Sequence, residues 1–389
     1  MLKTFDKYKY PLINPRIFND DINVGTKVLK SGQITMSKLT KKFEKEFAKY
    51  IGAKYAVMVN SGSSANLLAT SASCNPERQN IFKRNDEVLI PGICWSTSLW
   101  PLVQFGLKPI FVDVDPKTLN IDINDLKKKI TKRTKVIFCV HVLGNSADIS
   151  EIKNISKKLK LIMIEDTCES LGSTFKNKKL GTFGDFGTYS FYYSHQISSG
   201  EGGMVVCNNL KDYNILLSLR AHGWSRDRSD HKTIVKKNPK IDKRFIFVNY
   251  GFNVRPLEIQ AAIANQQLKK VNEFKRNRNY NRNQIIKIFK KNKINNNKLT
   301  FINDAKNVEC NWFGIPMLIA SNLKNKKEKI VKLIEEKGVE TRPIISGNFL
   351  NQPSIKLFNL NQKKVKLKNC QDIEDRGFFI GIDSKKTDT

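Results

Sequence analysis

The sequence predicts an α/β protein whose largely parallel β-sheet is covered by helices on both faces. Short apolar runs of strand length recur along the first half of the chain, and most are rich in β-branched residues. Helical patterns lie between them, which favours parallel strands because each parallel pair needs a crossover connection. The strand-like runs are residues 87–90, 109–113, 135–142 and 161–165, and the helical ones include residues 123–130 and 149–159.

The segment before these runs predicts a helix, a strand and a second helix. Residues 37–52 place apolar side chains on one helical face and lysines on the other, as in an amphipathic helix. Residues 54–60 then have the composition of a strand, and a new helix begins at Ala65 after four small polar residues. The apolar face of the first helix consists of Leu39, Phe43, Phe47 and Tyr50.

The pattern changes after residue 251 and predicts a smaller C-terminal α/β lobe. Residues 257–289 predict one long helix that is very basic in its second half. A strand at 312–319, a helix at 326–337 and a strand at 339–343 follow. We therefore expect a large domain with an N-terminal helix at residues 1–255 and a smaller domain at 256–389.

The charge of the chain is strongly positive, with 68 Lys+Arg against 36 Asp+Glu and a net charge of +32. A nucleic-acid-binding surface is one interpretation, but no recognition motif or basic arm accompanies the charge, which is spread over lysine- and asparagine-rich segments. We therefore predict no nucleic-acid partner. A basic enzyme that binds a pyrophosphate-bearing substrate would account for part of the excess.

Two further features of composition limit the location and the chemistry. No apolar run approaches the length of a membrane span, and the N-terminus has no apolar segment followed by a cleavage site. We expect no membrane partner and a cytoplasmic protein. The 7 cysteines are scattered without a CxxC pair, and there are only 4 histidines. Buried free thiols are therefore expected, and neither a metal nor an iron–sulfur cluster.

Three segments combine polar or aromatic residues with the predicted strand ends. Residues 61–66 (SGSSAN) precede a helix, whose N-terminal amides suit a phosphate, although an ordinary N-cap is the simpler interpretation. Residues 165–170 (EDTCES) close an apolar strand, where open α/β sheets place ligand chemistry, although Asp166 could instead cap a helix. Trp95 follows a strand, Pro and Gly, and could stack on a ligand or belong to the core.

Residues 190–203 (SFYYSHQISSGEGG) resemble the cofactor segment of the DegT/DnrJ/EryC1/StrS family of sugar aminotransferases, which use pyridoxal phosphate (PLP). The similarity runs in order from about Ile34 to about Gly381. It implies a PLP-dependent transferase fold of the aspartate aminotransferase type (fold type I). Such a fold has a large domain with a mostly parallel seven-stranded sheet and a small C-terminal α/β domain. The family pattern also has a closing helix, which this sequence lacks before it ends at Thr389.

The resemblance assigns phosphate-binding residues. It implies that Gly62 and Ser63 bind the PLP phosphate and that Ser190 adds a hydroxyl. Residues 251–262 are similar to a family segment whose asparagine reaches the cofactor phosphate of the neighbouring subunit. Asn253 therefore implies a homodimer with shared active sites.

The resemblance also assigns residues around the cofactor ring. Trp95 is expected to stack on the ring. Asp166 is expected to pair with the ring nitrogen and keep it protonated, so that the ring can accept electrons. Glu169 stands where the aminotransferases often have Gln or His, and we expect it near the ring oxygen.

The cofactor segment departs from most of the family at one position. His195 stands where a lysine usually holds PLP as a Schiff base, and histidine has no primary amine for that bond. The histidine replacement is typical of one branch, the nucleotide-sugar 3-dehydratases. Residues 34–36, 165–170, 220–227, 338–343 and 347–349 are also similar to that branch, although Ser37 replaces its usual Gly.

In that branch the amine form of the cofactor, pyridoxamine phosphate (PMP), condenses with a 4-keto sugar. Imidazole titrates near neutrality, so His195 could remove the C4′ proton and assist departure of the C3 hydroxyl. The absence of clustered cysteines favours the type without an iron–sulfur cluster, which regenerates PMP from L-glutamate and releases ammonia. The implied substrate is GDP-4-keto-6-deoxymannose, with GDP-colitose or a related 3,6-dideoxy sugar of lipopolysaccharide O-antigen downstream. His222 and Arg342 are implied substrate-binding residues.

Other functions remain open at this stage. His195 could be a core histidine in an inactive homologue, or in a regulator that binds PLP or a sugar nucleotide without catalysis. An aminotransferase could instead recruit another lysine, such as Lys176 or Lys178, although neither lies in the cofactor segment.

Overall fold

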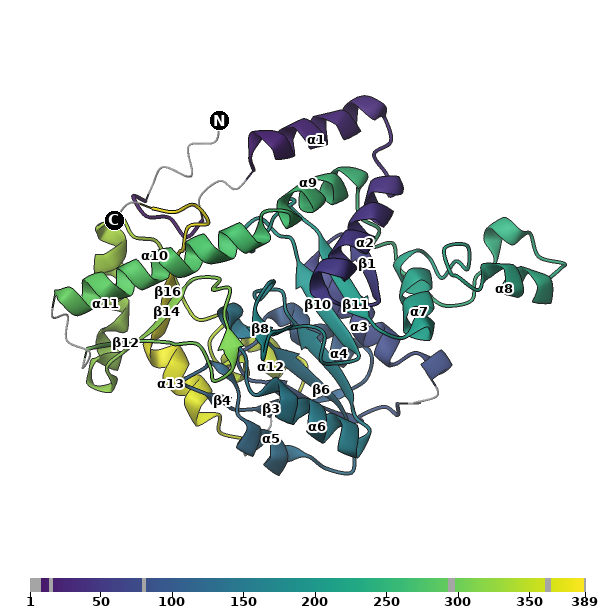
Figure 1. The fold of residues 1–389 in the computed structure, drawn as a ribbon. Helices are drawn as coiled ribbons and strands as arrows, with labels where there is room; N and C mark the ends of the chain where they lie inside the picture. The colour runs from purple at the N-terminus through teal and green to yellow at the C-terminus, as the bar shows by residue number, and fades with distance from the viewer. Residues whose placement is uncertain (1–7, 14–16, 79–81, 293–297, 361–364, 388–389) are drawn as a thin grey trace.

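The protein is built around a seven-stranded sheet, as shown by a computed structural model that describes residues 8–13, 17–78, 82–292, 298–360 and 365–387 (Figure 1). β11 pairs antiparallel with both of its neighbours, and the other six strands run parallel to one another. The largely parallel sheet is therefore confirmed. In spatial order the strands are β1 (Tyr55–Val59), β11 (Gly203–Cys207), β10 (Phe186–Ser190), β7 (Ile162–Asp166), β6 (Thr134–Val140), β2 (Glu87–Pro91) and β3 (Lys108–Val112).

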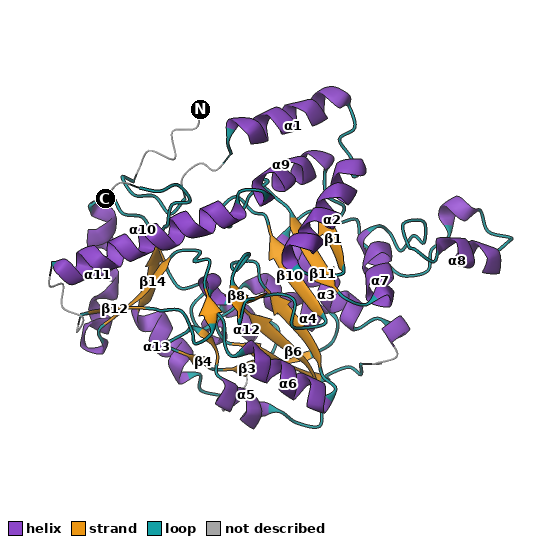
Figure 2. Ribbon diagram, viewed as in Figure 1, coloured by secondary structure: helices purple, strands orange, loops and turns teal. Residues whose placement is uncertain are grey.

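Helices cover both faces of this sheet, as Figure 2 shows. On β1 the side chains alternate between the faces: Val57 and Val59 join a large buried cluster with α3 (Gly62–Ser73) and α7 (Leu210–Arg220), whereas Met58 faces a second cluster. That second cluster contains Phe43 and Phe47 of α2 (Lys38–Ile51) and alanines of α9 (Glu258–Leu268). The period of two along the strand thus sends alternate residues into two apolar layers.

A second, antiparallel sheet lies in the C-terminal part of the chain. Its order is β12 (Leu299–Phe301), β14 (Ile315–Ile319), β16 (Gly377–Ile380) and β15 (Thr341–Arg342). The long helix α10 (Val271–Lys291) runs across the molecule towards it (Figure 1). α11 (Lys327–Glu336) and α13 (Lys368–Arg376) pack on this sheet. The short helix α12 (Pro353–Leu357) packs instead beside residues 349–351.

The remaining elements are mostly small. α4 (Ser96–Gln104), α5 (Ile123–Lys129) and α6 (Ile149–Leu159) connect the parallel strands, and α1 (Asn19–Ser31) packs on α9. α8 (His231–Lys237) projects from the body on a long loop (Figure 1). The minor strands are β4 (Val114–Asp115), β5 (Asn120–Ile121), β8 (Thr174–Phe175), β9 (Lys178–Lys179) and β13 (Val308–Glu309).

Two expectations about the C-terminal half are corrected. The single helix expected at 257–289 is two helices, because the chain breaks at Lys269 and Lys270. α9 packs on α1 and α2, whereas α10 leaves in the direction of the second sheet, and one straight helix could not do both. The strand expected at 312–319 begins only at Ile315. The division at residue 255 stays a prediction, since α9 packs with the N-terminal helices.

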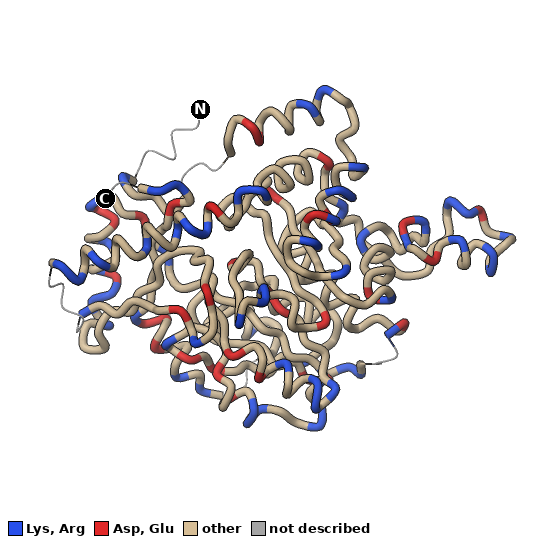
Figure 3. The backbone as a smooth tube through the Cα atoms, viewed as in Figure 1, with Lys and Arg blue, Asp and Glu red and all other residues tan. Residues whose placement is uncertain are grey.

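Basic residues are distributed along most of the backbone (Figure 3). They occur on α2, α10, the α8 arm and α11, with acidic residues between them. Among the described residues, no helix combines the length and the apolar character that a membrane crossing requires.

Candidate active site

The candidate site is a cavity of about 320 Å³ at the edge of the sheet where the parallel strands end. Open α/β sheets bind ligands at this edge, because the loops that leave the strands converge there. The loops after β1, β2, β6, β7 and β10 line the cavity from one side, and the C-terminal part closes it from the other. The C-terminal contributors are Phe313, Arg342, Pro343, Ile345 and Phe379.

The N-terminus of α3 forms one end of the cavity. Ser61 caps the helix by accepting a hydrogen bond from the amide of Ser64 at 3.1 Å, and Gly62 and Ser63 form the first turn. The Ser63 hydroxyl donates to Thr97 Oγ1 at 3.0 Å. A Cβ on Gly62 would lie 2.6 Å from Ser190 Cβ, so only glycine lets the helix start approach β10 this closely. The result is a set of amides and hydroxyls suited to an anion.

Asp166, the last residue of β7, is buried in the cavity floor and held in one orientation. Its Oδ2 accepts hydrogen bonds from Asn66 Nδ2 at 2.8 Å and from the Ser98 hydroxyl at 2.7 Å. Its Oδ1 accepts from the amide of Cys168 at 3.1 Å. Sequence reasoning missed Asn66 and Ser98, although Asn66 lies one turn into the helix that follows the glycine. These donors stabilise a carboxylate in a position where it can pair with a cation.

Trp95 and Glu169 lie on other walls of the same cavity. The Trp95 side chain is 59% exposed, so its ring presents an apolar face to the cavity and not to the core. Burial raises the pKa of Glu169 to about 8, and the nearby Asp166 carboxylate adds to the shift, while the amide of Leu143 at 2.9 Å opposes it. Glu169 is therefore largely protonated at neutral pH and can donate a hydrogen bond.

His195 lies on the loop after β10 and lines the cavity. Its ring meets the Phe313 ring edge-on with centroids 5.3 Å apart, and the Tyr192 ring likewise at 5.9 Å. Ser194 Oγ lies 3.4 Å from His195 Nδ1. His195 is only partly buried, so the structure places it at the cavity wall and not in the core. Phe313 was not expected at the site, because it comes from the far end of the sequence.

Two predicted site residues do not line this cavity. His222 and Asn253 lie on adjoining segments: the His222 amide donates to the Phe252 carbonyl at 2.8 Å, and Ala221 bridges to Asn253. Asn253 is exposed, and its side chain accepts a hydrogen bond from Arg255 Nε at 3.0 Å. One chain alone thus brings together eight of the ten predicted site residues: Gly62, Ser63, Trp95, Asp166, Glu169, Ser190, His195 and Arg342.

The alternative lysines lie elsewhere. Lys176 Nζ sits over the Phe175 ring at 5.5 Å, and Lys178 Nζ sits over the Phe183 ring at 4.7 Å. Within the described residues no lysine lines the cavity. The nitrogen-bearing ionisable side chains that line it are the imidazoles of His141 and His195 and the permanently charged guanidinium of Arg342.

His141 was not expected from the sequence. It follows β6, is 1% exposed, and its Nε2 lies 3.0 Å from Glu165 Oε2. Glu165 accepts further hydrogen bonds from the amides of Gly181, Phe183 and Gly184 at 2.6–2.9 Å. This buried pair lies next to the floor of the cavity and helps to fix the end of β6. The described residues contain no cluster of three or more His, Cys, Asp or Glu that could hold a metal.

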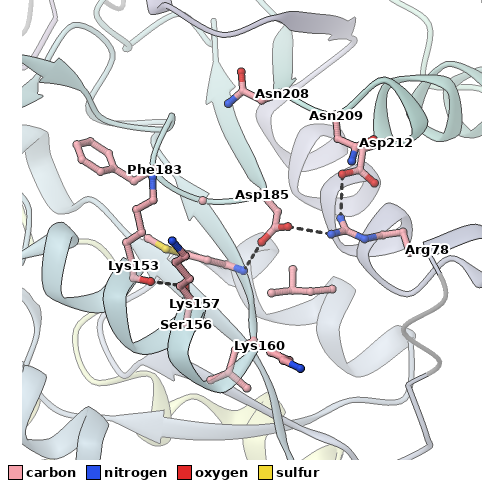
Figure 4. A pocket seen from close by; sticks show the side chains of 14 residues that line it. Arg78, Lys153, Ser156, Lys157, Lys160, Phe183, Asp185, Asn208, Asn209 and Asp212 are labelled. Atoms are coloured by element: carbon pink, nitrogen blue, oxygen red, sulfur yellow. Dashed lines mark hydrogen bonds and ion pairs between the residues drawn. The ribbon is translucent and has the colours of Figure 1, made fainter.

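A larger hollow at the opposite edge of the sheet has a different character (Figure 4). Arg78 lies between two carboxylates, 2.8 Å from Asp185 and 3.3 Å from Asp212. Asp185 also accepts from the Met163 amide at 2.9 Å. The charges at its centre are paired within the protein, so this network connects β7, β10 and α7.

Comparison with known proteins decides the family. Residues 15–388 match the DegT/DnrJ/EryC1/StrS aminotransferase family. The chain belongs to this family. It is 38% identical to a GDP-4-keto-6-deoxy-D-mannose 3-dehydratase from Yersinia pseudotuberculosis over 376 residues, which cover 96% of this chain and 93% of the relative.

Solved structures give the same result for the fold. The E. coli GDP-4-keto-6-deoxy-D-mannose-3-dehydratase with bound hydrated PLP superposes with a TM-score of 0.90 at 37% identity, covering 97% of this chain and 96% of the other. A GDP-4-keto-6-deoxymannose-3-dehydratase with a trapped PLP–glutamate geminal diamine has a TM-score of 0.89 at 37% identity and covers 97% of both chains. The fold is that of the PLP-dependent aminotransferases, as the sequence predicts.

The residues of this family member fit PLP. The close approach of Gly62 and Ser190 leaves helix amides facing a cradle that a Cβ would fill. Asp166 presents a hydrogen-bonded carboxylate on the cavity floor, where it can meet a protonated pyridine nitrogen. The exposed Trp95 ring offers a stacking surface.

Proposed function

We propose that this family member is a PLP/PMP-dependent nucleotide-sugar 3-dehydratase that acts on GDP-4-keto-6-deoxymannose. The observation that carries the proposal is His195 at the wall of a cavity that retains the phosphate cradle and the buried Asp166. An inactive homologue would have no reason to keep both. The similarity over nearly the whole length to dehydratases of that name supports the substrate.

The residues of the chain divide the work between binding and proton transfer. Gly62, Ser63 and Ser190 bind the cofactor phosphate, and Asp166 keeps the ring nitrogen protonated. When bound, the cofactor supplies an amine and an electron-accepting ring, which together allow the C3 hydroxyl of a 4-keto sugar to leave. Trp95 covers the ring and excludes water from that face.

His195 is the proposed base and acid. Imidazole takes up a proton from the carbon next to the cofactor amine and gives a proton to the departing C3 hydroxyl, which leaves as water. Phe313 and Tyr192 contact its ring edge-on and restrict its orientation, so that the proton is moved at one face of the site. Because His195 would form no covalent bond to the cofactor, the dehydrated sugar can leave as an enamine, which water hydrolyses to the 4-keto-3,6-dideoxy sugar and ammonia. L-glutamate is the proposed amino donor.

A homodimer completes the proposed site. His222, which is half-buried, and the exposed Asn253 lie on adjoining segments outside the cavity of their own chain. We infer that Asn253 reaches the cofactor phosphate of the second subunit and that His222 approaches the substrate of that same subunit. Within its own chain, Arg342 binds an anionic group of the substrate or of glutamate. All seven cysteines lie in the described part as free thiols, which supports a cytoplasmic location because reducing compartments keep thiols unpaired.

The test is the reaction of the full chain with PLP, L-glutamate and GDP-4-keto-6-deoxymannose. We expect a 4-keto-3,6-dideoxy sugar nucleotide, ammonia and 2-oxoglutarate. His195→Asn should bind PLP but lose turnover by at least about a hundredfold, the usual contribution of a general acid or base. His231→Asn is the matched control, because His231 lies on the projecting arm with its Nδ1 3.0 Å from the Ser225 hydroxyl. An aminated sugar as product, or full activity in His195→Asn, would contradict the proposal.

A further inference from the structure

A second cavity, of about 610 Å³, lies at the opposite end of β1 from the candidate active site. Residues of α2, the start of β1, α7 and residues 226–227 line it, and it shares no lining residue with the active-site cavity. Six of its lining residues are cations and two are carboxylates, which leaves four positive charges unbalanced. The cations are Lys41, Lys45, Lys49, Lys54, Arg220 and Arg226, and the carboxylates are Glu44 and Asp227.

Three of the lysines are arranged in a row on one helix. Lys41, Lys45 and Lys49 are spaced by four residues on α2, so their side chains lie one above the other on the same face. Like charges at this spacing repel one another and destabilise the helix slightly. Across the described residues, none of the three has a carboxylate within ion-pair distance. An anion in the cavity would remove the repulsion.

Arg220 forms the inner end of the cavity and is only 3% exposed. One of its terminal nitrogens pairs with Glu44 Oε1 at 2.5 Å and donates to the Met58 carbonyl at 3.0 Å, but its Nε has no hydrogen-bond partner among the described residues. A buried donor without a partner is costly. Because this Nε is itself buried, Arg220 adds positive charge at the inner end of the cavity but no accessible free donor.

The hollow of Figure 4 provides the comparison within the same chain. There Arg78 is held between Asp185 and Asp212, so its charge is matched by the protein. At the α2 cavity a single carboxylate, Glu44, faces Arg220, and the row of lysines remains unmatched. Lys153, Lys157 and Lys160 also line the hollow of Figure 4, so its four cations exceed its two carboxylates by two positive charges, whereas the excess at the α2 cavity is four.

One wall of the cavity is aromatic. The rings of Tyr55 and Tyr213 stack with centroids 4.7 Å apart and 16° between their planes. Both residues line the cavity. An aromatic wall beside a cationic floor suits a ligand in which a flat ring accompanies negative charge.

We propose that the α2 cavity binds a multivalent phosphate-class oxyanion, either free pyrophosphate or the diphosphate of a nucleotide. Arginine and lysine are the residues that recognise phosphates, through forked hydrogen bonds and mobile point charges respectively. The unmatched lysines, the excess of four positive charges and the tyrosine wall lie around one space of sufficient size. The site is independent of the catalytic cavity.

The experiment is calorimetric titration of pyrophosphate into the PLP-loaded full chain. Lys45→Gln with Lys49→Gln removes two lining cations, and Lys38→Gln with Lys42→Gln removes the same charge from exposed positions of α2 outside the cavity. We expect the first pair to weaken pyrophosphate binding at least about tenfold and the second pair by less than about twofold, because distant exposed charges are screened. An equal loss in both pairs, or no loss in the first, would overturn the proposal.

Two further arms separate the active site and the two ligand sources. Arg342→Gln alters the catalytic cavity and should leave pyrophosphate binding unchanged. If this variant loses pyrophosphate binding, the binding belongs to the catalytic cavity and the α2 site is refuted. GDP is titrated beside pyrophosphate. Equal affinities support a free phosphate ligand, whereas tighter GDP binding that Tyr55→Leu abolishes supports a nucleotide. If neither pyrophosphate nor GDP binds with a Kd below about 1 mM, the proposal is refuted.

Discussion

Replacing Gly62 by alanine is expected to damage the phosphate cradle. The new Cβ would lie 2.6 Å from Ser190 Cβ, 2.9 Å from Ser190 Oγ and 3.1 Å from Cys168 Sγ. Carbon atoms pack at about 3.5–4.0 Å, so α3 and the end of β10 would have to separate by roughly 1 Å. Such overpacking costs about 1–3 kcal/mol. If the cost falls on the phosphate-binding geometry, PLP affinity drops about tenfold to a hundredfold.

The assay is titration of PLP into the refolded chain without cofactor, with the unfolding free energy measured in parallel. Gly25→Ala in α1 is the matched control, because its Cβ would meet Ile263 Cδ1 at an ordinary 3.5 Å. That variant should be neutral or up to about 1 kcal/mol more stable, since alanine favours a helix interior. Adding Ser190→Gly to Gly62→Ala should restore stability but not PLP affinity. Unchanged PLP affinity in Gly62→Ala would refute the close-approach argument.

Two other predictions concern buried carboxyl groups. The pKa of Glu169 is raised to about 8 from an ordinary 4.5. Between pH 4.5 and pH 8 the folded chain therefore binds one more proton than the unfolded chain. The unfolding free energy should consequently fall as the pH rises from 4.5 to 8. Glu169→Gln should remove this fall in the unfolding free energy, which is at most about 1.4 kcal/mol per pH unit. Denaturant unfolding of both proteins from about pH 4 to pH 9 measures it. The same dependence of the unfolding free energy on pH in both proteins would contradict the assignment. Glu258 accepts hydrogen bonds from the amides of Ser37 and Thr40 and from the Thr40 hydroxyl at the start of α2, at 2.7–3.1 Å. Glu258→Gln should cost about 2 kcal/mol and speed amide exchange at residues 37–41, whereas exchange confined to other segments would count against this capping role.

Much of the local structure followed from the sequence. The helix at 149–159 was predicted with its observed bounds, and β2, β6 and β7 differ from their predicted bounds by at most two residues at either end. The strand at 186–190 was not predicted, since Gly, Thr and Ser interrupt its apolar character. The strand at 203–207 was not predicted either, although four apolar residues follow its glycine. Periodicity reports which side of an element is buried, and these central strands are buried on both sides.

The sequence by itself determined the chemistry of the candidate site: the glycine at a helix start, the carboxylate at a strand end, and His195 in a lysine's place. Only the tertiary structure decided which of these residues meet. It brought Phe313, which precedes β14, and Arg342 of β15 into the cavity with His195. It also held Asp166 with Asn66 and Ser98, and left His222 and Asn253 outside the cavity. Local patterns encode elements, whereas the packing of two sheets across hundreds of residues places their ends together, and no short-range periodicity contains that information.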